Sequence, residues 1–175
     1  MASCTRETLL AVGFVDVGAW SASGEAIDYK LDGEHAEANQ VLMGSPNALY
    51  AFVRGEDVQY IGKTTRGVRK RFIGYRRPGK RQQTNLRCCA NIKKAIKDAA
   101  EIRILVFTPI SNLRYLDFEI NLAAGLEDSL IKALDPPWNG REKGRPISEE
   151  TEREEAEEEA DGEADGISDT SRLKT

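Results

Sequence analysis

Two short β-rich runs separated by a turn lie near the middle of the chain, and they constrain its fold more than any other feature. The runs ALYAFV (48–53) and VQYIG (58–62) are rich in β-branched and aromatic residues, and the RGED between them is typical of a turn. The pair predicts a β-hairpin with Tyr50 on its first strand and Tyr60 on its second. Side chains alternate along a strand, so the face that each tyrosine takes depends on a register that the sequence leaves open.

Helices and a further strand are expected after the hairpin. In chain order we expect a helix over residues 68–75, a second helix over 85–100, a buried strand over 101–107 and a last helix over about 121–134. The expected N-caps are Thr64 or Thr65 for the first helix and Thr84 or Asn85 for the second. The Pro-Pro pair at 136–137 ends the last helix, because proline cannot continue it.

The first 46 residues give weaker signals. A short helix is expected over residues 5–12 and a strand over 26–31, with glycine-punctuated apolar residues between them. No apolar run approaches the 20 residues of a membrane span, so we expect neither a signal peptide nor a membrane anchor, and a cytoplasmic protein. Cys88 and Cys89 are adjacent and too close for an ordinary disulfide, and with His35 as the single histidine a zinc site is not expected.

Charge is divided sharply along the chain. Residues 148–175 hold twelve acidic and three basic residues, a net of −9, so the whole-chain value of −4 leaves +5 for residues 1–147. Residues 54–97 hold fourteen Lys and Arg against two acidic residues, a net of +12. A field of that sign suits a polyanion such as DNA, although a solvated basic surface would have the same composition. The low-complexity acidic segment is predicted to be disordered; it could serve solubility or compete with DNA for the basic face.

A set of polar residues follows the hairpin in a fixed order. ALY and YIG are separated by nine residues, and then come Lys63, Arg71 with Tyr75 four residues later, Glu127, and Asn139 in PPWNG. In this order and spacing the chain resembles the GIY-YIG nuclease superfamily over about 95 residues, with the first motif degenerate in its first two letters. Many members have histidine where this chain has Tyr75, so a histidine-based proton relay is excluded here.

The resemblance implies a fold, a domain layout and a set of active-site residues. The fold is α+β, with a small central three-stranded antiparallel sheet flanked by helices. The catalytic domain covers residues 47–147, with a DNA-contacting insertion around 76–90, between an N-terminal extension (1–46) and the acidic tail (148–175). The catalytic residues are Tyr50, Tyr60, Lys63, Arg71, Tyr75 and Asn139, and Glu127 binds one Mg²⁺ ion per active site.

Phosphodiester hydrolysis explains why these residue types suit the chemistry. It needs an activated water, neutralisation of charge on the phosphoryl oxygens and stabilisation of the leaving alkoxide. A lone carboxylate such as Glu127 can hold Mg²⁺, which keeps most of its waters, and Arg71 suits a bidentate phosphate contact. Tyrosine has a pKa near 10, so Tyr50 can act as a base only if nearby cations such as Lys63 lower that value.

Simpler interpretations stay open for several of these residues. Glu127 could be an exposed residue of a helix surface, and Arg71 one more residue of a basic helix. Tyr60 could orient the phosphate or only pack in the hairpin. Asn139 could tie the C-terminal segment to the active site or be an ordinary turn residue.

The remaining basic and amide residues predict how DNA is bound. Side chains of the types that contact phosphates or read purine edges are Arg66, Arg69, Arg76, Arg77, Lys80, Arg81, Gln83 and Asn85. The layout is most similar to the branch with type II restriction endonucleases, which implies a homodimer on double-stranded DNA and a companion DNA methyltransferase. Two alternatives remain: a structure-directed repair or mobile-element nuclease that nicks one strand, and an inactive DNA-binding protein.

Overall fold

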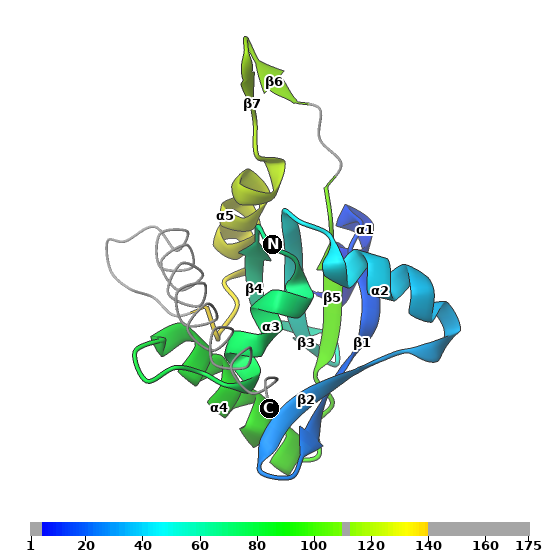
Figure 1. The fold of residues 1–175 in the computed structure, drawn as a ribbon, viewed down its shortest axis with the longest axis vertical. Helices are drawn as coiled ribbons and strands as arrows, with labels where there is room; N and C mark the ends of the chain where they lie inside the picture. The colour runs from blue at the N-terminus through cyan, green and yellow to red at the C-terminus, as the bar shows by residue number, and fades with distance from the viewer. Residues whose placement is uncertain (1–4, 110–112, 140–175) are drawn as a thin grey trace, which may run out of the picture. The chain divides into compact units, whose positions relative to one another are not determined.

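A five-stranded antiparallel sheet forms the centre of the protein, as the computed structural model shows for residues 5–109 and 113–139. Its strands are β1 (Val15–Ser23), β2 (Ala26–Leu31), β3 (Ala48–Arg54), β4 (Asp57–Thr64) and β5 (Arg103–Phe107). In space they follow the order β2-β1-β5-β3-β4, so the last strand in sequence lies in the middle (Figure 1). Both chain-local hairpins, β1–β2 and β3–β4, are thus joined through β5.

Five α-helices and a small second hairpin surround this sheet in the described residues. The helices are α1 (Arg6–Val12), α2 (Ala36–Gly44, entered through a 3₁₀ turn at Gly33–His35), α3 (Val68–Arg76), α4 (Gln83–Lys97) and α5 (Leu122–Leu134). Strands β6 (Arg114–Tyr115) and β7 (Phe118–Glu119) pair only with each other, and Figure 1 shows them projecting beyond the start of α5. No helix in the described residues is long and apolar enough to cross a membrane.

The predicted hairpin over residues 48–62 is confirmed as β3–β4, and its register shows which face of the sheet Tyr50 and Tyr60 take. Tyr50 lies opposite Gly62, and Phe52 lies opposite Tyr60. Since cross-strand partners share a face, Tyr50 and Tyr60 point to the same side of the sheet. That side carries the aromatic core, in which the Trp20 ring of β1 packs on Phe72 of α3 at 4.9 Å between centroids.

The predicted three-stranded sheet is wrong in its size, because the N-terminal residues supply two further strands. The expected strand at 26–31 is β2, and the expected helix at 5–12 is α1. Strand β1 was not predicted, since Gly18 interrupts its apolar alternation. A Cβ on Gly18 would lie 2.1 Å from the Lys30 carbonyl oxygen, and the register to β5 shifts between Asp16 and Gly18. Glycine here marks a bulge and a close backbone approach within a strand rather than a loop.

An ionic cluster fastens this N-terminal hairpin to the rest of the sheet. Arg103 of β5 donates from Nη2 to Asp16 Oδ1 of β1 at 2.6 Å and also bonds to Asp32, which follows β2. These hydrogen bonds raise the pKa of Arg103 above its already high ordinary value, so its charge is permanent. The β1–β2 hairpin is therefore built into the sheet on the side of β5 away from β3 and β4, while Thr5 and Arg6 bond to Asp57 and Glu56 at the β3–β4 turn.

Two helix starts differ in detail from the predictions, and a third agrees with them. Helix α3 begins at Val68, after Gly67 with a φ of +97°, rather than at a cap on Thr64 or Thr65. Helix α4 begins at Gln83, earlier than a cap at Thr84 or Asn85 allows. The start of α5 agrees with expectation, because Asn121 Oδ1 accepts from the Ala124 N–H at 3.2 Å. The predicted disordered tail, 148–175, lies outside the described residues.

Candidate active site

Three tyrosine hydroxyls meet in the interior beside the β3–β4 hairpin. The Tyr50 and Tyr75 hydroxyl oxygens lie 2.7 Å apart, and the Tyr75 hydroxyl donates to the Tyr60 oxygen at 3.2 Å. All three side chains are buried, and they come from β3, β4 and α3. Gly62 makes room for this arrangement, since a Cβ at that position would stand 2.6 Å from the Tyr50 hydroxyl oxygen. The third letter of YIG is thus required by the tyrosine of ALY.

Burial fixes the protonation of two of these phenols. Desolvation raises the pKa of Tyr60 well above its ordinary value near 10, and the neighbouring Tyr50 raises it further. Desolvation likewise raises the pKa of Tyr75 well above 10, with the Arg71 charge opposing this shift. Tyr60 and Tyr75 therefore act as neutral hydroxyls at ordinary pH and can pass a proton along the row only by giving one and receiving another.

Arg71 lies directly on this cluster. Its guanidinium carbon is 4.6 Å from the centroid of the Tyr75 ring, one turn further along α3, and the side chain is only 1% exposed. A buried guanidinium over an aromatic face is held by a cation–π contact. Arg71 is thus set apart from the exposed basic residues of the same helix, Arg69, Lys70 and Arg76.

Lys63 and Glu127 form a separate buried pair on the other side of the hairpin. Lys63 Nζ lies 3.9 Å from Glu127 Oε2, and both side chains are buried. The cross-strand partner of Lys63 is Leu49 rather than Tyr50, so by alternation Lys63 and the tyrosines take opposite faces of β4. We expected Lys63 to act on Tyr50. In the structure Lys63 lies on the opposite face of β4 from Tyr50 and faces the Glu127 carboxylate of α5. Full burial also excludes the interpretation of Glu127 as an exposed surface residue.

Asn139 bonds both polar groups of one residue in the YIG strand. Its Oδ1 accepts from the Ile61 N–H at 2.9 Å, and its Nδ2 donates to the Ile61 carbonyl at 2.7 Å. The neighbouring Trp138 N–H donates to the Gln59 carbonyl at 2.9 Å, and Arg87 Nε donates to the Trp138 carbonyl. Residues 138–139 therefore line the free edge of β4 in place of a sixth strand, between Tyr60 and Gly62.

The predicted DNA-contacting residues fall into two groups. Side chains at the surface are Arg69, Arg76, Arg77, Lys80, Arg81 and Gln83, with Arg66 half-buried. Arg69 donates to the Gln40 carbonyl at 2.8 Å and Arg76 to Asp28 at 3.2 Å, so these two are already held against the protein. Asn85 is fully buried, and its amide donates to Gln82 Oε1 at 3.0 Å.

Gln82 and Gly62 are the residues that sequence reasoning underrated. Gln82 Oε1 also accepts from the Gly79 N–H at 2.8 Å, so one buried side chain closes the loop between α3 and α4. In the sequence this role is indicated by the spacing Gly79-x-x-Gln82-x-x-Asn85, which puts the Gln82 side chain three residues from each of its two partners. The hydrogen bonds of Gln82 hold the backbone of the loop that carries the exposed residues Lys80 and Arg81.

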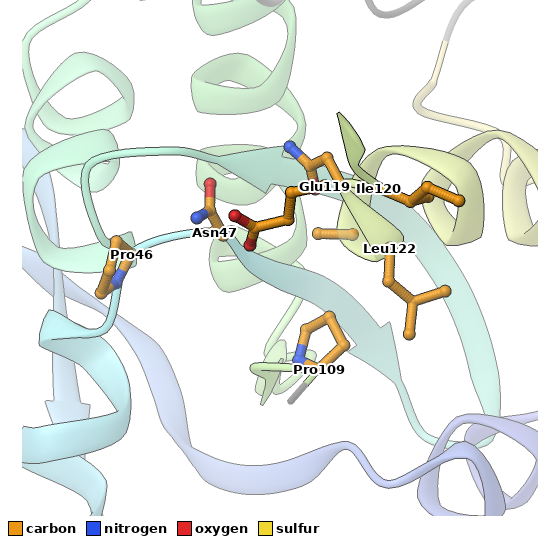
Figure 2. Close-up of a pocket in the computed structure, with 8 residues that line it drawn as sticks. Pro46, Asn47, Pro109, Glu119, Ile120 and Leu122 are labelled. Atoms are coloured by element: carbon orange, nitrogen blue, oxygen red, sulfur yellow. The ribbon is translucent and has the colours of Figure 1, made fainter. Parts of the chain in front are cut away.

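A pocket of about 390 Å³ opens where β3 begins and α5 starts. Figure 2 shows Pro46, Pro109 and Leu122 around it, with the Glu119 carboxylate turned toward Asn47. Ala123 also lines it and lies one helical turn before Glu127, on the same face of α5. The pocket therefore reaches α5 one turn before Glu127.

The described residues contain no group of three or more His, Cys, Asp or Glu side chains that could hold a metal ion. The Lys63–Glu127 pair supplies one carboxylate, that of Glu127. Carboxylate oxygen is the donor that Mg²⁺ prefers, and this ion commonly keeps several of its waters. The donor type therefore suits one hard divalent ion bound through one protein ligand rather than a cage of side chains, and because both Glu127 oxygens are buried, such an ion would bind only after the residues that cover them have moved.

The solved structures that resemble the chain include two proteins. One is a mutant of bacteriophage T4 EndoII, with a TM-score of 0.56 and 22% sequence identity, covering 77% of this chain and 98% of that one. Another is restriction endonuclease HPY188I in complex with product DNA, with a TM-score of 0.47 and 13% identity over 82% of this chain and 86% of that one. No family model and no curated protein matches the chain. The fold is that of T4 EndoII.

Proposed function

We propose that this chain is a metal-dependent DNA endonuclease of the GIY-YIG type. The observation that carries the proposal is the meeting of Tyr50, Tyr60 and Tyr75 hydroxyls under the guanidinium of Arg71. Residues up to 25 positions apart in sequence thus form a polar cluster inside an aromatic core. The fold shared with T4 EndoII supports the same assignment.

Arg71 is the residue that would meet the scissile phosphate. Its planar guanidinium can donate two parallel hydrogen bonds to phosphoryl oxygens and offset the charge that develops on them. Because the side chain is 1% exposed, a phosphate can reach it only after whatever covers it has moved. Stacking on Tyr75 keeps the guanidinium plane fixed during that approach.

Tyr50 is the proposed proton acceptor for the attacking water. It shares a 2.7 Å hydrogen bond with Tyr75, which in turn donates to Tyr60. A phenolate on Tyr50 would be stabilised by one hydrogen bond from Tyr75, whose hydroxyl proton would turn from Tyr60 to Tyr50, and by the Arg71 charge beside Tyr75. The raised pKa values of Tyr60 and Tyr75 leave these two as donors rather than competing bases.

Glu127 would hold the divalent ion, for which Mg²⁺ is the proposed species. When bound, such an ion would neutralise charge on the phosphoryl and leaving oxygens. Because Glu127 and the tyrosine cluster lie on opposite faces of β4, a phosphate would have to meet both around this edge strand. Lys63 is the cation that faces the Glu127 carboxylate, with Nζ 3.9 Å from Oε2. Asn139 is a positioning residue, since it fixes Ile61 between Tyr60 and Gly62.

The proposed substrate is double-stranded DNA cut at a specific sequence by a homodimer, with a companion DNA methyltransferase protecting the same sites. Lys80, Arg81 and Gln83 on the loop before α4 and at its start are exposed and include the side-chain types that read guanine and adenine edges. Nicking by a repair or mobile-element enzyme is the second candidate, because one active site per chain cuts one strand.

Plasmid digestion with Mg²⁺ tests the proposal. We expect discrete bands from the wild-type chain, no product from Glu127→Gln and a loss of about 10²–10³-fold from Arg71→Ala. Matched controls are Asp128→Asn and Lys70→Ala, exposed neighbours that should keep full activity. Nicked circles without linear product would favour the second candidate. A wild-type chain that binds DNA and cuts none of the tested substrates would refute the enzyme.

A further inference from the structure

The β6–β7 hairpin carries an apolar face that the described residues leave open. Arg114 pairs with Glu119 and Tyr115 with Phe118, and the Ile120 N–H donates to the Leu113 carbonyl at 2.9 Å. Alternation therefore puts the Leu113–Ile120 and Tyr115–Phe118 pairs on one face and the Arg114–Glu119 pair on the other. Tyr115 and Phe118 are 70% and 72% exposed.

Leu116 extends this surface at the tip, at a backbone cost. It is 78% exposed and has a φ of +54°, a left-handed conformation that favours glycine or asparagine. A large apolar side chain in that position neither packs in the core nor suits the turn. A two-stranded hairpin is also marginal by itself in water. Both facts point to a partner that covers the apolar face.

We propose that the partner is a second copy of this chain, joined through the same face of its own hairpin. Taking about 200 Å² for a fully exposed large side chain, Leu113, Tyr115, Leu116, Phe118 and Ile120 offer roughly 600 Å² per chain. Two such faces packed together remove about 1,200 Å² from water, the lower end of a specific interface. Identical flat faces meet naturally across a two-fold axis.

Charge argues against DNA as the occupant. The hairpin holds Arg114 against Asp117 and Glu119, a net of −1, whereas residues 54–97 carry the positive charge. A nucleic-acid groove would repel these carboxylates, while an apolar face of another chain would leave them in water at the rim.

The pairing would also act on the candidate active site, a consequence that rests on the proposed function. Ile120 leads directly through Asn121 into α5, which carries Glu127. Glu119, on the back of the hairpin, and Ile120 line the pocket at the start of α5 (Figure 2). Docking two hairpins would therefore fix the start of α5 in both copies and place two cleavage sites in one particle.

Sedimentation equilibrium of the full chain, without DNA or metal, tests the interface. We expect a dimer whose Kd rises about 30-fold or more in Tyr115→Ser/Phe118→Ser, since buried aromatics dominate interfaces. Leu116→Gly is the second variant: glycine suits the positive φ, so the hairpin should fold at least as well while the dimer weakens. Asp117→Asn is the control, because it removes a charge at the turn while keeping the apolar side chains and the Arg114 bond to the backbone carbonyl of residue 117, and it should leave the Kd unchanged.

Every result of these measurements either supports or refutes the proposed interface. A wild-type chain that stays monomeric to about 100 μM, or apolar-face variants that dimerise like wild type, would overturn the interface. If the chain is a monomer and the same variants lose affinity for a DNA duplex instead, DNA is the occupant and the proposal is wrong. Because dimerisation is measured without cleavage, a chain that dimerises but cuts no DNA would refute the endonuclease alone.

Discussion

Replacing Asn139 should destabilise the fold by an amount that its two hydrogen bonds predict. The side chain is 8% exposed and satisfies the Ile61 N–H at 2.9 Å and the Ile61 carbonyl at 2.7 Å. A net hydrogen bond is worth about 1 kcal/mol, and a buried group left unsatisfied costs about 1–3 kcal/mol. Water can enter part of the vacated space at this edge, so we expect about 2–3 kcal/mol for Asn139→Ala.

Asn139→Asp gives a sharper version of this prediction. At neutral pH the carboxylate still accepts from the Ile61 N–H but faces the carbonyl that Asn139 Nδ2 served. When protonated, it can donate to that carbonyl and reproduce both bonds. The folded state therefore favours the protonated acid and raises its pKa above about 3.9. Stability relative to Asn139→Ala should be highest below about pH 4 and fall as pH rises through the raised value.

Urea unfolding at pH 7 and pH 4 measures both effects from the midpoint and slope of each transition. Asn121→Ala is a matched control, because that asparagine makes one exposed capping bond and should cost about 1 kcal/mol at either pH. If Asn139→Ala changes stability by less than about 0.5 kcal/mol, or if the Asp and Ala variants stay level at both pH values, the bridging role is wrong.

Three further predictions follow from the site and the charge pattern. Gly62→Ala should cost about 1–3 kcal/mol in urea unfolding and reduce cleavage, because its Cβ would lie 2.6 Å from the Tyr50 hydroxyl; unchanged stability would contradict the packing. Burial raises the pKa values of Tyr60 and Tyr75, so their contribution to stability should be full below about pH 10 and be lost above it. Tyr75→Phe should therefore reduce the fall of the melting temperature between pH 9 and 11. An equal fall in the melting temperature of both proteins would count against this. Deleting residues 148–175 removes a net −9 and should tighten non-specific DNA binding at low salt in a filter or anisotropy assay, with equal affinities ruling out competition by the tail.

The β3–β4 hairpin and the last helix could be predicted because their signals are local. ALYAFV and VQYIG are paired by a short turn, and Asn121 and Pro136 mark the two ends of α5. Strand β1 could not be predicted with equal ease, since Gly18 breaks its alternation for a reason that lies on β2. Its pairing with β5 joins residues almost 90 positions apart, as the Arg103–Asp16 bonds show, and no local pattern encodes that.

For the candidate site, too, the sequence predicted the residue types but not where each side chain lies. Residue types and spacing picked out the tyrosines, Arg71, Glu127 and Asn139, and the structure brings the three phenols together. The face of Lys63 depends on strand register, which puts it opposite Leu49 and toward Glu127. LRYLDFEI alternates with period two and could have been recognised as a hairpin, but its length is short for a strand signal.

The central place of β5 in the sheet sets an order of events for folding. Hairpins β1–β2 and β3–β4 need only neighbouring residues, so each can form early and independently. Neither can join the other until residues 103–107 have left the ribosome, because β5 alone lies between β1 and β3. Until then, both hairpins expose a strand edge to the solvent. We therefore expect closure of the sheet by β5 to be the slow, cooperative step, and substitutions in Ile104 or Leu105 should slow refolding in stopped-flow experiments more than comparable changes in β2.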